Sequence, residues 1–247
     1  MVHSRECWCN GARIAGSRYL EHSMIFVQNL VYAPLGYRLF QMHLHWGRNN
    51  TEGSEHTLNG QSFPLEAHFV HYNSRFASID AAVRSGDHDA LIVVGIFFQV
   101  GATTPPSLTS ILNLLPYYTN VQQETEVQEY INLADMYPKG LEYYTYLGSF
   151  TTPMCNEVNR WIVLARPVSI KQSDLDRIRT VNLVLSSTRT GPGKNFRPLQ
   201  PLNGRKVTAS FNSLPYIAPP SPPPGPAPAP TPTPLPQDPG NPQMLEG

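Results

Sequence analysis

Ten consecutive residues, Leu91–Val100, read LIVVGIFFQV and contain a single polar side chain, Gln99. The run is rich in β-branched and aromatic residues and is far shorter than a membrane-spanning helix. A segment of this kind is typical of a central strand that is buried on both faces of a sheet. The chain is therefore predicted to contain a sheet with this segment as a central strand.

Four further segments have a strand-forming composition and are bounded by Gly, Pro or Asn. They are YRLFQMHLHW (37–46), LEAHFVHYN (65–73), RWIVLARPV (160–168) and RKVTASF (205–211). Helix signals are fewer. PPSLTSILNLL (105–115) starts at prolines and has helical apolar spacing, and SDLDRIRTVNL (173–183) places Ser173 three residues before Asp176, as in a capping box. The fold is predicted to be mostly β, of the α+β class, with a few short surface helices.

The last part of the chain has a different composition, since residues 215–247 include 14 prolines. Such a segment cannot form a hydrogen-bonded ladder, so it is predicted to be a disordered, extended tail. A spacer, a docking segment and an O-glycosylated stalk all fit, and a spacer is favoured; its partner is unknown. The formal net charge is zero, which argues against a nucleic-acid partner. No run approaches about 18 apolar residues, so no transmembrane segment is predicted.

Histidines are concentrated on two of the predicted strands, with His43 and His45 on one and His68 and His71 on the next. Because side chains alternate along a strand, His43 and His45 project from the same face. Three neutral imidazoles around one point make a catalytic zinc site, with the fourth position left for water. Hydrogen-bonded strand histidines without a metal are the alternative. The spacing alone leaves both His68 and His71 open as the third ligand.

Two polar residues accompany these histidines. Gln41 shares the face of His43 and His45, and Glu66 shares the face of His68. Each could hydrogen-bond the far nitrogen of a ligand histidine and so fix its tautomer and orientation. Gln41 and Glu66 are therefore predicted to support a metal site from outside the ligand set.

Several motifs occur in order along the chain: FQMHLHWG (40–47), GSEHTLNGQSFPLEAHFVHYN (53–73), VVGIFFQVG (93–101), YYTYLGSFTTP (143–153) and NFRPLQPLNGR (195–205). Together they resemble the α-class carbonic anhydrase family, in particular its extracellular type. The resemblance runs from about Leu35 to Phe211, and more loosely back to about His22. It implies a domain over 22–214 with a large, twisted, mainly antiparallel central sheet. It also assigns a zinc ion to His43, His45 and His68.

The resemblance implies a carbonate dehydratase that converts carbon dioxide reversibly to bicarbonate and a proton by zinc-hydroxide attack. Thr151 matches the threonine that accepts the hydrogen of the hydroxide, and Glu55 matches the carboxylate that receives the proton of Thr151. His22 loosely matches the family's proton-shuttle histidine, a role that suits a near-neutral pKa. The interval between His22 and His43 is shorter than is usual in the family.

Other positions carry over in the same way. Thr152 matches a residue that contacts bicarbonate, and Asn195 matches a position whose backbone carbonyl orients one zinc histidine. An apolar wall for carbon dioxide is implied at Val70, Val93, Phe150 and Trp161. Ordinary core packing is the alternative for those four residues. Phe150 replaces the usual leucine of the family, which is expected to narrow the space beside Thr151.

Residues 1–21 lack a counterpart of the family's QSP motif and early tryptophans, and they are interpreted as a truncated or divergent N-terminal segment. This departure keeps a second function open. The chain could be a catalytically impaired, carbonic-anhydrase-like binding or matrix scaffold.

The resemblance to extracellular members implies a disulfide bond between Cys155 and an early cysteine, with Cys9 favoured over Cys7. Such a bond indicates an oxidising compartment. Asn49 in Asn-Asn-Thr is a potential N-glycosylation acceptor, which agrees with a secreted glycoprotein. No signal peptide is recognisable in this chain, and a cytoplasmic location is the alternative.

Overall fold

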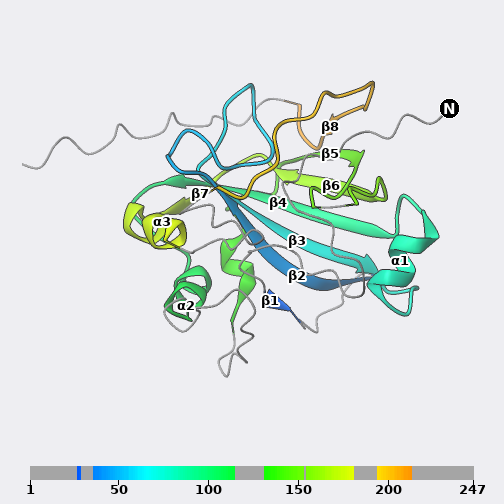
Figure 1. Cartoon of the computed structure of the whole chain (residues 1–247), viewed down its shortest axis with the longest axis horizontal. Helices are drawn as coiled ribbons and strands as arrows, with labels where there is room; N and C mark the ends of the chain where they lie inside the picture. The colour runs from blue at the N-terminus through cyan, green and yellow to red at the C-terminus, as the bar shows by residue number, and fades with distance from the viewer. Residues whose placement is uncertain (1–26, 29–35, 115–130, 153, 181–193, 213–247) are drawn as a thin grey trace, which may run out of the picture.

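The computed structural model describes residues 27–28, 36–114, 131–152, 154–180 and 194–212. Their strands form an 8-stranded sheet in the order β1-β2-β3-β4-β6-β5-β8, with β7 also paired to β4 (Figure 1). The strands are β1 Val27–Gln28, β2 Tyr37–Trp46, β3 Leu65–Asn73, β4 Leu91–Val100, β5 Tyr143–Gly148, β6 Asn159–Leu164, β7 Val168–Ile170 and β8 Thr208–Ala209. The predicted segments 1–21 and 215–247 lie outside the described residues.

The sheet is mixed but mainly antiparallel. Strands β1 to β4 pair antiparallel in chain order, and β5 pairs antiparallel with both β6 and β8. Only the pairings of β4 with β6 and with β7 are parallel in the described part of the chain. The prediction of a mostly β fold around a large, mainly antiparallel sheet is confirmed.

Three of the five predicted strands have the predicted bounds, namely 37–46, 65–73 and 91–100. The predicted strand at 160–168 is wrong in its extent, because the chain leaves the ladder after Leu164 and re-enters it at Val168. Pro167, which has no N–H to donate to a ladder, lies in the break. The predicted strand at 205–211 shrinks to two residues, β8. Strand β5 was not predicted.

The described helices are short: α1 Ile79–Ser85, α2 Pro106–Leu114, α3 Gln172–Arg179 and the 3-10 helix η2 Leu133–Met136. Helix α2 begins at proline, as predicted. The predicted capping box of α3 is wrong, because Lys171 is the N-cap residue, no side chain caps the helix, and Ser173 lies within it. No helix in the described ranges is long and apolar enough to span a membrane.

The helices α2, α3 and η2 cover one face of the sheet (Figure 1). The core between them contains sheet residues of β2, β3 and β4 together with helix residues: Met42, Leu44, Trp46, Ala67, Phe69, Ile96, Phe98, Leu108, Ile111, Leu112, Met136, Leu175 and Ile178. Fully burying a Leu or Phe side chain contributes roughly 1.5–3 kcal/mol, so this layer fixes which face of each strand is inward. The residues that alternate with it on β2 and β3 face the opposite side.

Candidate metal centre

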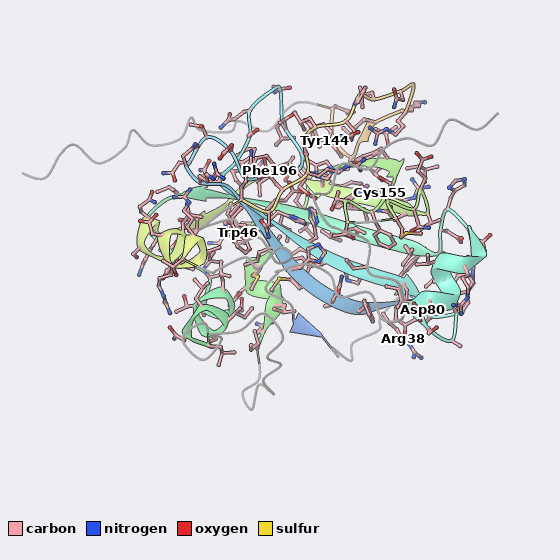
Figure 2. The ribbon with its side chains drawn as sticks, in the orientation of Figure 1. Arg38, Trp46, Asp80, Tyr144, Cys155 and Phe196 are labelled. Carbon is pink, nitrogen blue, oxygen red and sulfur yellow. The ribbon has the colours of Figure 1, made fainter. Side chains whose placement is uncertain are left out.

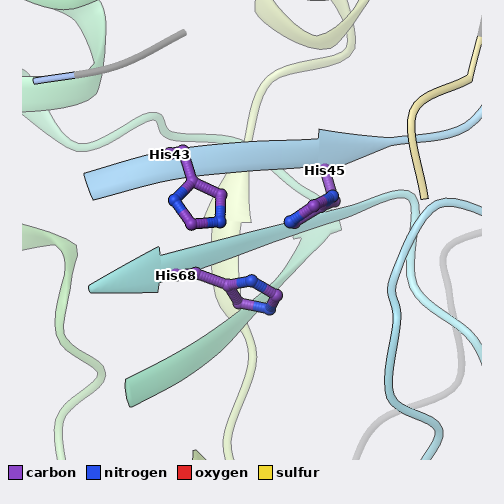
Figure 3. A group of neighbouring side chains, drawn as sticks. All are labelled: His43, His45 and His68. Atoms are coloured by element: carbon purple, nitrogen blue, oxygen red, sulfur yellow. The ribbon is translucent and has the colours of Figure 1, made fainter. Parts of the chain in front are cut away.

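Three buried imidazoles meet on the face of the sheet opposite the helices. His43 and His45 project from β2 and His68 from β3, and His43 is paired directly with His68 across the two strands. Ring centroids are 5.0 Å apart for His43 and His45, 5.2 Å for His43 and His68, and 4.5 Å for His45 and His68. One nitrogen from each ring lies within 4.8 Å of the others, and the rings converge in Figure 3.

The alternation of side chains explains why these histidines and not others are brought together. Met42 and Leu44 fill the core under the helices, so His43 and His45 must lie on the other face. On β3, Phe69 occupies the same core, so His68 faces His43 while His71 faces away. The Nδ1 atom of His71 contacts the backbone oxygen of Phe69, at 2.9 Å. His71 is therefore not part of the cluster.

Hydrogen bonds determine which ring nitrogen of His45 and of His68 is available to bind a metal ion. Nδ1 of His45 lies 2.9 Å from the backbone oxygen of Asn195, and a carbonyl can only accept, so Nδ1 donates. In the neutral ring Nε2 then carries the lone pair, and Nε2 is buried without a hydrogen-bond partner among the described residues. Nε2 of His68 is held by a carboxylate oxygen of Glu66 at 2.7 Å, which leaves Nδ1 of His68 facing the cluster.

The surroundings favour neutral imidazoles. Burial, followed by the neighbouring rings of His45 and His68, lowers the pKa of His43 well below its ordinary value, against a smaller opposing effect of Glu66. Burial and the ring of His45 also lower the pKa of His68, although Glu66 opposes them. The neutral ring is the form that ligates a metal. Three nitrogen ligands is the number that catalytic zinc sites take from the protein, so the cluster fits zinc.

Glu66 is fully buried and has its whole hydrogen-bonding capacity in use. Its Oε1 accepts from His68 and from Nδ1 of His56, at 2.6 Å, and its Oε2 accepts from the backbone N–H groups of Glu55 and His56. Burial alone would raise the pKa of Glu66, but its electrostatic interactions and hydrogen bonds with His56 and His68 hold the pKa well below the usual range. Gly95 faces Glu66, since a Cβ there would lie 3.0 Å from Oε1.

His56 is a site residue that the sequence reasoning missed. Its Nε2 lies 2.7 Å from the hydroxyl of Tyr146, and its ring lies against Trp161 with centroids 4.7 Å apart. Burial would lower the pKa of His56, but the charge of Glu66 and its hydrogen bond raise it overall. The signal was present, because His56 directly follows Glu55 in the quoted motif GSEH.

Glu55 lies beside the imidazoles. Its Oε1 accepts a hydrogen bond from the backbone N–H of Arg197 at 2.7 Å and is 3.4 Å from Nδ1 of His45. Its Oε2 is buried, has no hydrogen-bond partner within the described ranges, and is 3.9 Å from Nδ1 of His68. An ionised carboxylate can only accept, so Oε2 is placed to receive a hydroxyl or water proton.

The loop 194–197 reaches the site by pairing with the end of β2. The backbone N–H of Asn195 donates to the oxygen of Trp46 at 3.2 Å, and its side-chain amide accepts from the N–H of Trp46 and donates to the oxygen of Leu44. Figure 2 shows Trp46 and Phe196 at the same end of the sheet. These hydrogen bonds hold the Asn195 carbonyl beside His45 and the Arg197 N–H beside Glu55.

Thr151 and Thr152 lie in a tight turn between β5 and β6. The N–H of Phe150 donates to the oxygen of Asn156 at 3.0 Å, and that of Cys155 donates to the oxygen of Thr152 at 3.0 Å. Both threonines are half-buried. Cys155, labelled in Figure 2, is disulfide-bonded, whereas Cys7 and Cys9 lie outside the described residues.

The four residues assigned to an apolar wall belong to a cluster on the histidine face. Val70, Val93 and Trp161 are buried neighbours on adjacent strands, and Phe150 packs against them. Phe150 also packs against a second cluster around Leu91. The ring of Trp161 lies 4.7 Å from that of His68, and its Nε1 donates to the oxygen of Ser149. Trp161 therefore links the apolar wall and the segment of Thr151 to the histidines, because it contacts both His68 and Ser149.

The remaining predicted residues are placed as follows. Gln41 is buried at the paired position of Val70, on the histidine face of β2. Its contact with His43 stays a prediction. His22, the predicted proton shuttle, lies outside the described residues. Asn49 is exposed, and its side-chain oxygen accepts hydrogen bonds from the N–H and hydroxyl of Thr51.

Comparison with known proteins agrees with this arrangement. The sequence model of the family described as eukaryotic-type carbonic anhydrase matches residues 15–211. Carbonic anhydrase 3 of Bos taurus is 35% identical over 179 residues, which are 71% of this chain and 66% of that protein. Carbonic anhydrase 7 of Mus musculus is 38% identical over 181 residues, which are 72% of this chain and 66% of that protein. Carbonic anhydrase 5A, mitochondrial, of Homo sapiens is 36% identical over 179 residues, which are 72% of this chain and 57% of that protein. The chain therefore spans about two thirds of the length of these relatives, or somewhat less. The match covers the histidine cluster and most of the sheet, and the chain belongs to the eukaryotic-type carbonic anhydrase family.

Proposed function

We propose that the chain is a zinc-dependent carbonic anhydrase that converts carbon dioxide and water reversibly to bicarbonate and a proton. The observation that carries the proposal is the convergence of the buried residues His43, His45 and His68, with one nitrogen of each ring within 4.8 Å of the others. The lowered pKa values of His43 and His68 favour their neutral rings and support the same conclusion. Membership of the carbonic anhydrase family supports the same reaction.

The ligand atoms follow from the hydrogen bonds. His45 would bind through Nε2 and His68 through Nδ1, because their other nitrogens are held by Asn195 and Glu66. Zinc supplies a Lewis acid that lowers the pKa of a water molecule towards neutrality, an effect for which carbonic anhydrase is itself the standard example. The buried carboxylate of Glu66 fixes the tautomer of His68 and makes it a better ligand.

Thr151 and Glu55 are proposed to orient the attacking oxygen. The hydroxyl of Thr151 would donate its proton to the buried Oε2 of Glu55, which has an acceptor site to spare. The oxygen of Thr151 could then only accept a hydrogen bond from the nucleophile, which turns the nucleophile's lone pair towards the substrate. The N–H of Arg197 fixes the carboxylate of Glu55 for this role. Thr152 is proposed to contact bicarbonate.

The apolar wall is proposed to hold carbon dioxide beside the histidines. Val70, Val93, Trp161 and Phe150 offer no hydrogen-bonding group towards an apolar substrate other than the indole N–H, which Ser149 occupies. The proton released in each cycle must reach solvent, and His22 is proposed to carry it, since an imidazole can exchange protons near neutral pH.

Two measurements made on one sample test the function. The purified chain is expected to contain one zinc ion and to accelerate carbon dioxide hydration in a stopped-flow indicator assay, and an aromatic sulfonamide is expected to block that activity. Bound zinc without hydration would contradict the enzyme and favour the impaired scaffold. Absence of bound zinc would contradict both the metal centre and the reaction.

Replacing Thr151 with valine is expected to lower kcat/KM for hydration about 100-fold, the usual cost of removing one hydrogen bond that acts in the transition state. The substitution preserves shape and leaves the three histidines intact, so zinc content should not change. Stopped-flow rates and elemental analysis of the same preparation check both statements. Thr208→Val, in the exposed strand β8, is the matched control and should behave as the unaltered chain. An unchanged rate in Thr151→Val would remove Thr151 from the mechanism.

We further propose that the disulfide partner of Cys155 is Cys9 and that the protein works in an oxidising compartment. The disulfide-bonded state of Cys155 and the exposed Asn49 acceptor support this. Proteolytic digestion of the native protein without reductant is expected to give one peptide pair that joins Cys155 to Cys9, and reductant should separate it. Mass spectrometry identifies the pair. A Cys7–Cys155 pair would correct the partner, and three free thiols would contradict the compartment.

A further inference from the structure

A buried carboxamide at the start of β6 has no hydrogen-bond partner among the residues that the structure describes. Asn159, the first residue of β6, is 1% exposed, and neither its Oδ1 nor its Nδ2 makes a hydrogen bond within the described ranges. The amide of Asn195, by contrast, has both of its atoms in use. Buried polar side chains almost always have a partner, because leaving one unpaired is costly. The amide of Asn159 is therefore expected to meet a polar ligand.

The strand register places the side chain of Asn159 on the same face of the sheet as the three histidines. Side chains two residues apart on a strand share a face, about 6.6 Å apart, so Asn159 lies on the same face as Trp161. Trp161 contacts the ring of His68 and belongs to the proposed apolar wall. Asn159 is paired with Leu91 on β4, and Phe150 packs against the cluster around Leu91. Asn159 therefore adjoins the wall on the side away from the histidines.

The chemistry of the amide selects one of the two carbon species of the reaction. A carboxamide offers two N–H donors and one acceptor oxygen. Carbon dioxide has no hydrogen to donate and only weakly accepting oxygens. Bicarbonate has negatively charged oxygens that accept and one O–H that donates, so it can satisfy both ends of the amide. A hydrogen bond to a charged group is also stronger than one between neutral groups.

We propose that Asn159 is a specificity-determining residue that binds bicarbonate, donating from Nδ2 to a charged oxygen and accepting at Oδ1 from the hydroxyl. The inference rests on the proposed carbonic anhydrase function and adds to it a preference of this site for the hydrated species. Retention of bicarbonate makes its release slower and its binding as a substrate of the reverse reaction tighter.

The test compares Asn159→Leu, which has nearly the same shape but no polar atom, with the unaltered zinc-loaded protein. Bicarbonate is titrated at pH 8 and constant ionic strength, and its dissociation constant is taken from the rise in unfolding temperature that a bound ligand produces. The dissociation constant is expected to rise about tenfold in Asn159→Leu, as for the loss of a hydrogen bond to a charged group. The zinc content of the variant should equal that of the unaltered protein, because Asn159 is not one of the three histidines that would hold the ion. Without bicarbonate the variant should unfold at a higher temperature, because an unpaired buried amide has been removed.

Thr145→Val is the matched control. The hydroxyl of Thr145 is also buried without a partner in the described part of the chain, but Thr145 pairs with Ile162, on the opposite face of the sheet from Asn159 and Trp161. Thr145→Val leaves the proposed site untouched, so the bicarbonate dissociation constant of this variant should equal that of the unaltered protein. Asn159→Val serves as a second apolar variant if the leucine side chain disturbs folding.

The possible outcomes distinguish a failure of this inference from a failure of the proposed carbonic anhydrase function. The inference is overturned if the unaltered protein and the Asn159 variants bind bicarbonate equally well, or if neither binds it. If carbon dioxide hydration is measured in that case, the proposed enzyme function is still supported. Bicarbonate binding that depends on Asn159, in a zinc-loaded protein without hydration activity, supports the binding site and overturns the enzyme. An equal loss of affinity in Thr145→Val would show a general effect of packing and overturn the specific contact.

Discussion

His45→Ala is expected to reduce the zinc content of the purified chain from near one ion per molecule to near zero and to abolish carbon dioxide hydration. The side chain is buried, and its Nε2 has no partner other than the proposed ion among the described residues. Zinc binding to structural sites in zinc-finger peptides contributes about 10–16 kcal/mol in total, and on that scale the loss of one of three protein ligands should weaken zinc binding by about three orders of magnitude or more. Elemental analysis after dialysis against a weak chelator measures the loss directly and independently of activity.

The matched control is His71→Ala. His71 lies on β3 only three residues from His68, but it faces away from the cluster and contacts the backbone oxygen of Phe69. Its removal should leave both the zinc content and the hydration rate close to those of the unaltered chain. Equal zinc loss in the two variants would mean that metal is held elsewhere or that the strands have shifted register.

Much of the sheet could be predicted from the sequence because its central strands are long and uniformly apolar or regularly alternating. Strands β2, β3 and β4 have the predicted bounds. Alternation also predicts that His43 and His45 share a face, and the positions of Met42 and Leu44 in the helix-covered core agree with that. Spacing could not decide between His68 and His71, since that choice depends on the register between β2 and β3, which pairs His43 with His68.

The parts that could not be predicted depend on contacts between distant segments. The amide and carbonyl of Asn195 anchor it to the end of β2, some 150 positions away, and only the fold brings the two together. Gly95 leaves space for Glu66 on the neighbouring strand, which no local pattern reveals. Strand β5 has three tyrosines in YYTYLG, a strand-forming composition, but the segment also lies within the family motif YYTYLGSFTTP. Asn159 had no signal in the sequence, because its unpaired state exists only in the folded protein.

The proposed metal centre also needs a rigid support, and the hydrogen bond from His68 to the buried Glu66 is expected to contribute to it. Glu66→Ala is expected to lower the free energy of unfolding of the metal-free protein by about 3–5 kcal/mol, the usual cost of removing one partner from a buried, hydrogen-bonded charge network. The substitution leaves four donors without their acceptor: the backbone N–H groups of Glu55 and His56 and the ring N–H groups of His56 and His68. Because Glu55 and His68 are buried and the side chain of His56 is only 16% exposed, water cannot readily replace the carboxylate.

Urea unfolding at pH 7 in the presence of a chelator, followed by circular dichroism and tryptophan fluorescence, measures this loss without the contribution of zinc. Glu142→Ala is the matched control, because Glu142 forms an ion pair with Arg166 that is partly open to solvent, and surface pairs contribute little. Glu66→Gln should fall between the two, since its amide keeps one acceptor oxygen but turns an N–H group towards other donors. If Glu66→Ala were no less stable than Glu142→Ala, the hydrogen bonds of Glu66 would not support the fold. The orientation of His68 would then have to come from the packing of Trp161 against its ring.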